Sequence, residues 1–192
     1  MSHFSVFVIL PERNLDPDDV NEMLEKALRK FDENLDASEC IPKEIDCFCR
    51  YNPKTRENDL PAEKDCKNCN GTGRYTVYEN PNGSKWDWWV WGGRWDGYLV
   101  NNVMRVESII DLNEWKKKIN EERDLSEKDD GYIYSPSAFA YVTPEGEWIE
   151  KGEMGWWAMV SEEKDDDEWE NIVDELMIKY EDHYAYCVDC HI

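Results

Sequence analysis

Four cysteines in two close pairs are the residues of this sequence best suited to bind a metal ion. Cys47 and Cys49 form the first pair with one residue between them, and Cys66 and Cys69 form the second with two. Two such pairs, joined by a flexible segment, can bring four thiolates to tetrahedral separation around Zn²⁺. Because four thiolates leave no open coordination position, the pattern predicts a structural zinc ion and disfavours a catalytic one. A redox dithiol and unligated thiols are the alternatives.

The second cysteine pair continues as Asn70-Gly71-Thr72-Gly73, which gives the pattern CxxCxGxG. Glycines at these positions allow backbone N–H groups to turn towards the ligating sulfurs. The segment resembles the zinc-binding cysteine repeat of DnaJ-type chaperones, and this resemblance implies metal binding only. It covers one short segment, and the spacing of Cys47 and Cys49 departs from the repeat, so it implies neither the chaperone fold nor chaperone activity.

A tryptophan-rich segment with one arginine is the second candidate site. Its candidate ligand-binding residues are Arg94, Trp88, Trp89, Trp91 and Trp95. Exposed indoles beside flexible glycines could stack a base or sugar while the guanidinium binds a phosphate or carboxylate. The alternative is that the indoles fill a core and a sheet edge. We interpret the segment as two strands around a glycine bend.

A third candidate site lies at the end of the chain, where Asp189 and His191 stand two residues apart. In a strand both side chains project from one face, so the carboxylate could orient the imidazole as a general base or a ligand. The alternative is a structural pair at a sheet edge, since no nucleophile with recognisable spacing accompanies them. His3 could join them only if the first and last strands are neighbours. The sequence has no Walker loop, dinucleotide fingerprint, nucleophile elbow or HExxH helix, so no motif supports an enzyme.

The elements that must position these residues are two helices and two terminal strands. Residues 4–10 are almost continuously apolar, which predicts a central strand covered on both faces. Asp16 and Pro17 predict the start of a helix over 17–31, and a second helix is predicted over 166–180; both have apolar residues at helical spacing. Residues 184–191 alternate in a way that predicts a final strand.

Shorter elements complete the prediction. A strand is expected over 74–78, followed by a turn over 80–83, and a hairpin is expected over 138–149. Asp111 could cap a short helix whose inward residues are Leu112, Trp115 and Ile119. The acidic residues at 165–168 are interpreted as a solvated helix start, because successive helical side chains point in different directions and do not converge on a magnesium ion.

Together these elements predict a single α+β domain that spans residues 1–192. Its sheet is expected to be mixed or antiparallel, with the two main helices on one face. The segment 41–73 is polar, contains three prolines and holds four of the seven cysteines. We expect it to be a zinc-knuckle insertion that projects from an edge of the sheet and that cannot fold without the metal.

The charge of the chain limits the classes of partner. Its 44 acidic residues against 22 basic ones give a net charge of −22, which repels nucleic acids and anionic membranes. A partner protein with a basic surface is favoured, although the charge could serve solubility alone. The apolar runs are too short to cross a bilayer and no signal peptide is visible. We therefore expect the protein in the cytoplasm. In that compartment seven cysteines indicate metal ligands and buried thiols and not a disulfide framework, and their odd number points the same way.

Five blocks of sequence carry a wider resemblance. They are MSHFSVFVI at the start, the CxxCxGTG segment, NPNGSKWDWWVWGGRWDG, TPEGEW with GEMGWW, and VDCHI at the end. Together they are similar to a family of uncharacterised proteins from bacteriophages and related bacterial mobile elements. The resemblance implies a phage or prophage setting in the cytoplasm of a host cell, and it supplies no catalytic residues.

Two classes of function follow. The first is a phage-encoded accessory protein, a non-enzymatic acidic binding protein that inhibits a host or antiviral-defence factor. The alternative is a protein that binds a nucleotide, to sequester a signal, or hydrolyses one, with a tryptophan-rich pocket and Arg94. In the hydrolytic form, Asp189 and His191 are the candidate catalytic residues.

Overall fold

The computed structural model describes residues 2–110, 137–155, 157 and 159–192. Two compact units make up the chain. The first combines Met1–Asp32 with Lys85–Ile192, and the second, Glu33–Ser84, is inserted between them. The helix expected from Asp111, with Leu112, Trp115 and Ile119, lies outside the described residues.

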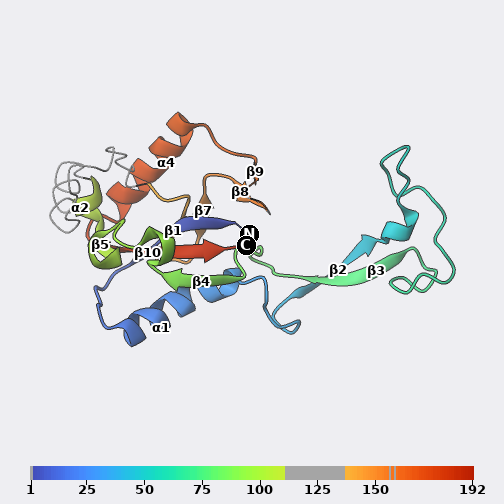
Figure 1. The fold of residues 1–192 in the computed structure, drawn as a ribbon, viewed down its shortest axis with the longest axis horizontal. Helices are drawn as coiled ribbons and strands as arrows, with labels where there is room; N and C mark the ends of the chain where they lie inside the picture. The colour runs from blue at the N-terminus through green and yellow to red at the C-terminus, as the bar shows by residue number, and fades with distance from the viewer. Residues whose placement is uncertain (1, 111–136, 156, 158) are drawn as a thin grey trace. The chain divides into compact units, whose positions relative to one another are not determined.

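The first unit is built on a six-stranded mixed sheet (Figure 1). Five strands lie in the order β4 (Trp88–Trp91), β10 (Tyr184–His191), β1 (His3–Leu10), β6 (Ala140–Val142) and β7 (Trp148–Glu150), and β5 (Val103–Arg105) also pairs with β10. β1 runs antiparallel to β10 and parallel to β6. The predicted α+β class with a mixed sheet is therefore confirmed.

β1 lies in the middle of this sheet, as the run of apolar residues predicted. Its neighbours are β10 and β6, and its residues from Phe4 to Ile9 are all buried. Its partner β10 is the last strand of the chain, and its register pairs His3 with His191. Both chain ends therefore lie in the sheet, side by side.

Two long helices begin where the sequence predicted. Helix α1 (Pro17–Leu28) is capped by the Asp16 side chain, which accepts hydrogen bonds from the N–H groups of Asp18 and Asp19, and it continues into the 3-10 helix η1 (Arg29–Phe31). Helix α4 (Asp166–Lys179) is capped by Asp165, which accepts from the N–H of Glu168 at 2.8 Å. These caps satisfy N–H groups that have no partner within the helix.

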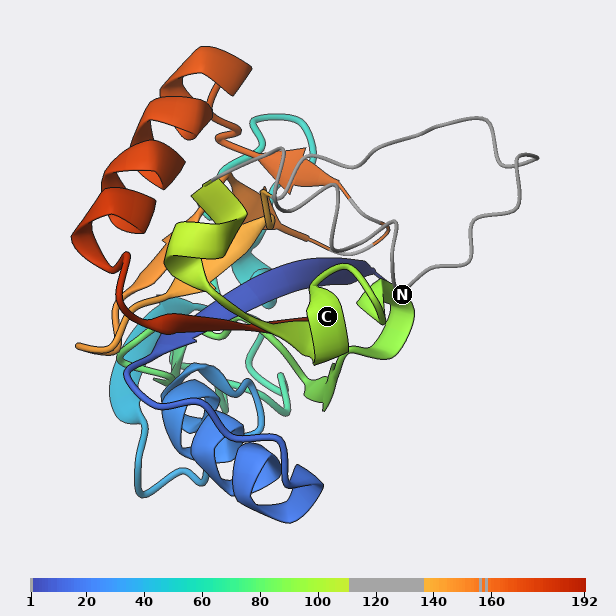
Figure 2. The same cartoon turned by 90° about the vertical axis from the view of Figure 1, so that its left-hand side faces the viewer.

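The two helices cover opposite faces of the sheet (Figures 1 and 2). Phe4, Val6 and Val8 of β1 share one core cluster with α1, whereas Phe7 and Ile9 share the other with α4. The expectation that both helices lie on one face is wrong. Successive side chains of a strand point to opposite faces, and β1 is apolar at nearly every position. Each face of β1 therefore needs its own cover, and one helix supplies each.

The tryptophan-rich segment forms one strand and not the expected two. After β4, Gly92 and Gly93 take φ values of 72° and 56°, and the chain enters the 3-10 helix η3 (Gly93–Trp95). Two consecutive residues with positive φ coil the backbone too tightly for a second strand. The 3-10 helix η4 (Val100–Asn102), β5 and the short helix α2 (Val106–Ile110) follow.

The predicted hairpin over 138–149 is confirmed by the antiparallel pairing of β6 and β7. After this hairpin, β8 (Glu153–Met154) and β9 (Val160–Ser161) pair antiparallel as a separate two-stranded sheet. No helix in the described part of the chain is long and apolar enough to span a membrane.

The second unit is a ribbon with a cysteine-containing end. β2 (Ile41–Asp46) and β3 (Arg74–Glu79) pair antiparallel, and the 3-10 helix η2 (Phe48–Arg50) follows β2. This confirms the strand predicted over 74–78. The compact unit, at 33–84, is wider than the 41–73 segment identified from the sequence. Its buried residues are Cys47, Cys69 and Gly73, so no cluster of apolar side chains forms a core there.

Candidate functional site

The four cysteines of the second unit form a compact cluster. The Sγ atoms of Cys47, Cys49, Cys66 and Cys69 all lie within 4.8 Å of one another. Cys47 Sγ is 3.5 Å from Cys66 Sγ, and Cys49 Sγ is 3.7 Å from Cys69 Sγ. Four thiolates around one Zn²⁺ would stand about 3.8 Å apart, given bonds of about 2.3 Å. The cluster could therefore bind a metal ion, and it contains the four residues that the sequence predicted.

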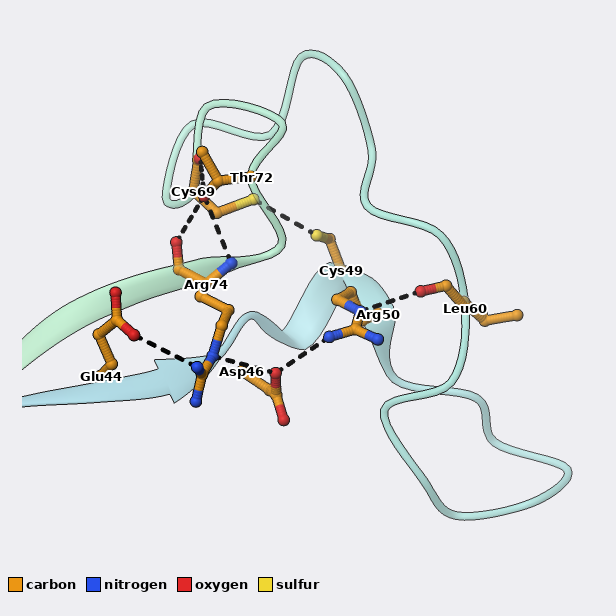
Figure 3. Close-up of polar contacts among 8 residues, drawn as sticks. All are labelled: Glu44, Asp46, Cys49, Arg50, Leu60, Cys69, Thr72 and Arg74. Atoms are coloured by element: carbon orange, nitrogen blue, oxygen red, sulfur yellow. Dashed lines mark hydrogen bonds and ion pairs between the residues drawn. The ribbon is translucent and has the colours of Figure 1, made fainter.

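Hydrogen-bonded turns hold the four cysteines close together. The N–H of Cys47 donates to the carbonyl of Gly73 at 2.8 Å, which joins the end of β2 to the start of β3. In the second pair, the N–H of Asn70 donates to the carbonyl of Cys66 at 2.8 Å. The hydroxyl of Thr72 donates to the carbonyl of Cys69 at 2.7 Å (Figure 3). Both pairs are therefore held by backbone bonds at the same end of the ribbon.

Ion pairs beside the cluster connect the strands to η2 (Figure 3). Arg50 Nη1 lies 3.0 Å from Asp46 Oδ1, and Arg74 lies 3.2 Å from Glu44 Oε2 and 3.6 Å from Asp46 Oδ1. Arg50 Nε also donates to the carbonyl of Leu60 at 3.1 Å. Exposed ion pairs contribute about 1 kcal/mol or less each. They orient the loops of this unit, but they cannot replace a core.

The local electrostatics also favour a bound cation. Hydrogen bonds from the amides of Cys69 and Asn68 lower the pKa of the Cys66 thiol to about 7. The pKa of the Cys47 thiol is raised to about 12: the Cys49 amide hydrogen bond lowers it, but burial and the neighbouring thiols raise it more. Four crowded thiols cannot all ionise without a positive charge among them, and a metal cation would supply that charge.

The structure does not gather the tryptophans of the second candidate site on one surface. Trp89 and Trp91 pack against the core cluster under α1, and Trp95 packs against the cluster under α4. Trp88 is 41% exposed. The side chain of Arg94 is exposed, and its backbone N–H donates to Asp189 Oδ2 at 3.0 Å. Only Trp88 and Arg94 of this set therefore lie beside the third candidate site.

The third candidate site contains two histidine–carboxylate pairs. Asp189 and His191 do project from the same face of β10, but they do not pair with each other. His3 Nδ1 lies 2.9 Å from Asp189 Oδ1, and His191 Nδ1 lies 2.5 Å from Asp87 Oδ1. His3 joins the site because the terminal strands are neighbours, the condition that the sequence left open. Sequence reasoning missed Asp87; its place directly before the strand tryptophans, in Trp-Asp-Trp, was the available signal.

Three aromatic rings pack together at this site. Trp88 stacks on His191 with centroids 5.1 Å apart and an interplanar angle of 16°. His3 meets both rings edge to face, at 5.0 Å from His191 and 5.3 Å from Trp88. Asp189 is 2% exposed and His191 4% exposed. The Nε2 atom of His191 is buried and has no hydrogen-bond partner.

A scan against protein-family models found no match to this chain, and searches of curated proteins and of solved structures found none either. Any functional conclusion therefore depends on the geometry of these sites.

Proposed function

We propose that this chain is a phage-encoded accessory protein, a zinc-containing acidic binding protein that inhibits a host or antiviral-defence protein by occupying its basic surface. It acts in the cytoplasm of the host cell. The observation that carries this proposal is the solvent face of α4. There Glu168, Glu170, Asp174 and Glu175 are exposed, and none makes an ion pair with a described residue.

The negative charge is unevenly distributed along the chain. Residues 33–84 hold ten Asp and Glu against seven Lys and Arg, a net of −3 out of the chain's −22, which leaves −19 for the rest. Carboxylates on a rigid helix keep their spacing, and they attract a basic partner over about a Debye length, roughly 10 Å at moderate salt. Charge complementarity of this kind speeds encounter and selects the partner.

An apolar side chain stands among these carboxylates. Ile178 is 66% exposed and lies one helical turn beyond Asp174. Interfaces combine a small apolar centre with a charged rim, and the centre supplies most of the affinity. Ile178 is therefore the proposed anchor, and the carboxylates around it are the proposed rim.

Zinc is the metal proposed for the four-cysteine cluster. Tetrahedral thiolate sites suit Zn²⁺ or iron, and Zn²⁺ needs no redox partner to remain bound. Since the second unit has no apolar core, the free energy of metal binding would provide much of its folding free energy. The ion is thus proposed to be structural, and the alternative of a redox dithiol is not needed to explain the cluster.

The binding proposal is tested by locating the contact and then measuring its strength. A photo-crosslinking amino acid at position 178, expressed in host cells, should capture one main partner; the same amino acid at the exposed Leu15 should not. Affinity is then measured with the purified partner at about 50 and about 300 mM salt. We expect the dissociation constant to rise at least about tenfold over that range.

Paired charge reversals separate a local contact from net charge. Glu170→Lys with Asp174→Lys should weaken binding at low salt by at least about tenfold. Glu22→Lys with Glu25→Lys changes the net charge equally on the exposed side of α1, and it should weaken binding much less. Salt-insensitive binding, or equal losses in the two double variants, would rule out the α4 face as the contact.

A further inference from the structure

The end of the sheet that holds both chain termini combines two carboxylate-bound histidines, an arginine and an exposed indole. We propose that this is an acid–base site for phosphodiesters of the nucleotide class, in which His191 and His3 transfer protons and Arg94 binds the phosphate. This inference goes beyond the proposed binding function and uses none of its residues. Its failure would leave the α4 contact untouched.

The strand register brings the two imidazoles together. Ser2 and Ile192 exchange both backbone hydrogen bonds at 3.1 Å, so they form a hydrogen-bonded pair. Pairs alternate along antiparallel strands, and the next pair, His3 with His191, is therefore of the non-hydrogen-bonded kind, in which side chains stand closest. The separation of 5.0 Å between the centroids of the two rings agrees with this.

Each carboxylate fixes one ring nitrogen and leaves the other for a ligand. Asp87 and Asp189 bond to the Nδ1 atoms of His191 and His3. In a neutral ring with a proton on Nδ1, Nε2 carries the lone pair and can accept a proton. Asp87 directly precedes β4, on one side of β10, and His3 stands on β1, on the other side, with its ring edge to face against that of His191.

The unpartnered Nε2 of His191 needs an explanation. A buried polar atom without a hydrogen bond costs about 1–3 kcal/mol, and such atoms are rare in folded proteins. Strained or unsatisfied groups concentrate where a ligand or a reaction uses them. A group on a bound ligand would satisfy this atom.

The backbone around Asp189 is built closely against its carboxylate. The Arg94 N–H donates to Oδ2, and Gly93 lies so near that a Cβ there would stand 2.5 Å from Asp189 Cβ and 2.6 Å from Oδ2. Asp189 therefore holds His3 in one orientation. Positioning of this kind is what a proton-transfer residue requires.

The ligand class follows from Arg94 and Trp88. The backbone N–H of Arg94 donates to Asp189, so the arginine side chain begins next to this carboxylate. Its guanidinium makes no hydrogen bond or ion pair with any described residue, although the chain is rich in carboxylates. A guanidinium binds phosphate oxygens in a fork. The exposed part of Trp88 offers a surface on which a nucleobase can stack. A metal is less suited, because among the described residues only the four cysteines gather three or more ligating side chains.

The reaction is a hydrolysis that needs water alone as co-reactant. Nε2 of neutral His191 takes a proton from water as the water oxygen forms a bond to phosphorus. The bond from phosphorus to the leaving oxygen breaks, and protonated His3 gives its Nε2 proton to that oxygen. The products are a phosphate monoester and an alcohol, and a proton exchange with solvent restores both rings.

The test uses the full-length chain with bis(4-nitrophenyl) phosphate and a panel of linear and cyclic dinucleotides, with products separated by chromatography. We expect turnover of at least one substrate, with a bell-shaped pH profile. His191→Ala and His3→Ala should each lower kcat at least about 100-fold, and Arg94→Ala should mainly raise KM. The control is His183→Ala, which removes a partly buried histidine outside this site, whose Nδ1 lies 2.8 Å from Asp182 Oδ1, and it should not change turnover.

A second variant guards against misfolding. Asp87→Asn keeps the shape of the side chain, so a folded Asp87→Asn protein with low kcat and an altered pH profile would support a positioning role for Asp87. Absence of turnover across the panel, binding without turnover, or turnover that survives in folded His191→Ala or His3→Ala would each overturn the proposal.

Discussion

His3 and His191 stand directly opposite each other on neighbouring antiparallel strands, although they lie near opposite ends of the chain. Their rings are 5.0 Å apart, and each is bound through Nδ1 to its own carboxylate. A site made from both termini forms only when the central pair of strands has closed. Contact between the two rings therefore shows that β1 and β10 have paired in the correct register.

Gly93→Ala should destabilise the first unit by about 1–3 kcal/mol, because a Cβ at φ 56° is strained and meets the Asp189 side chain. The same change should disturb the bond between Asp189 and His3. Urea unfolding measures the stability, and the chemical shifts of the His3 ring report the local change.

Gly146→Ala is the matched control for that variant. Gly146 also has a positive φ, of 80°, but a Cβ there would meet only the mobile end of Lys30. We expect a loss of about 1 kcal/mol from backbone strain and no change at His3. Equal losses of stability in Gly93→Ala and Gly146→Ala, with unchanged His3 chemical shifts in both, would contradict this interpretation. Close packing against Asp189 would then not explain the requirement for glycine at position 93.

Much of the fold follows from sequence patterns that act over short distances. The cap at Asp16 and the apolar spacing of α1 and α4 are local, and local patterns predict where helices begin and which side they bury. Which face of the sheet each helix covers depends on tertiary packing. The apolar run of β1 did indicate that both faces of the sheet are covered, because a strand that is apolar on both faces must be buried on both.

Asp165→Ala should lower stability by about 0.5–2 kcal/mol, because it leaves the N–H of Glu168 without its partner at the start of α4. Chemical denaturation measures the loss. Glu170→Ala, an exposed change inside the same helix, should stay within about 0.5 kcal/mol of the original protein. Equal effects of the two changes would show that the cap contributes nothing.

Tyr180→Phe should have a pH-dependent effect. The Tyr180 hydroxyl donates to Glu145 Oε2 at 2.5 Å and holds the pKa of that carboxyl below its usual range. A depressed carboxyl pKa stabilises the fold above the unfolded value, about 4.3, and the contribution disappears as pH falls through the lower folded value. Melting temperatures of the two proteins should therefore differ at pH 7 and converge at low pH.

Glu145→Gln is the control for this interpretation. It removes the titrating group, so Tyr180→Phe made in that background should change the melting temperature by the same amount at every pH. A difference between the original protein and Tyr180→Phe that stayed constant from pH 7 down to about pH 3 would contradict the assigned role of Glu145.

The candidate sites differ in how far the sequence revealed them. The four cysteines were identified because ligand spacing is a local property, and the structure gathers all four. The tryptophans were grouped because they are adjacent in sequence, yet strand alternation and the 3-10 turn at Gly93 send them to different faces. The pairing of Asp87 with His191 joins β10 to the residue before β4, and no spacing rule predicts contacts between strands so distant in the chain.

The metal content of the purified, reduced protein tests the four-cysteine site most directly. Elemental analysis should find one zinc ion per chain, and Cys66→Ser with Cys69→Ser should lose it and expose 33–84 to proteolysis. Cys187→Ser, at a buried cysteine outside the cluster, should keep the full zinc content. Protein without stoichiometric metal in which 33–84 still resists proteolysis would contradict the proposal that the ion organises this unit.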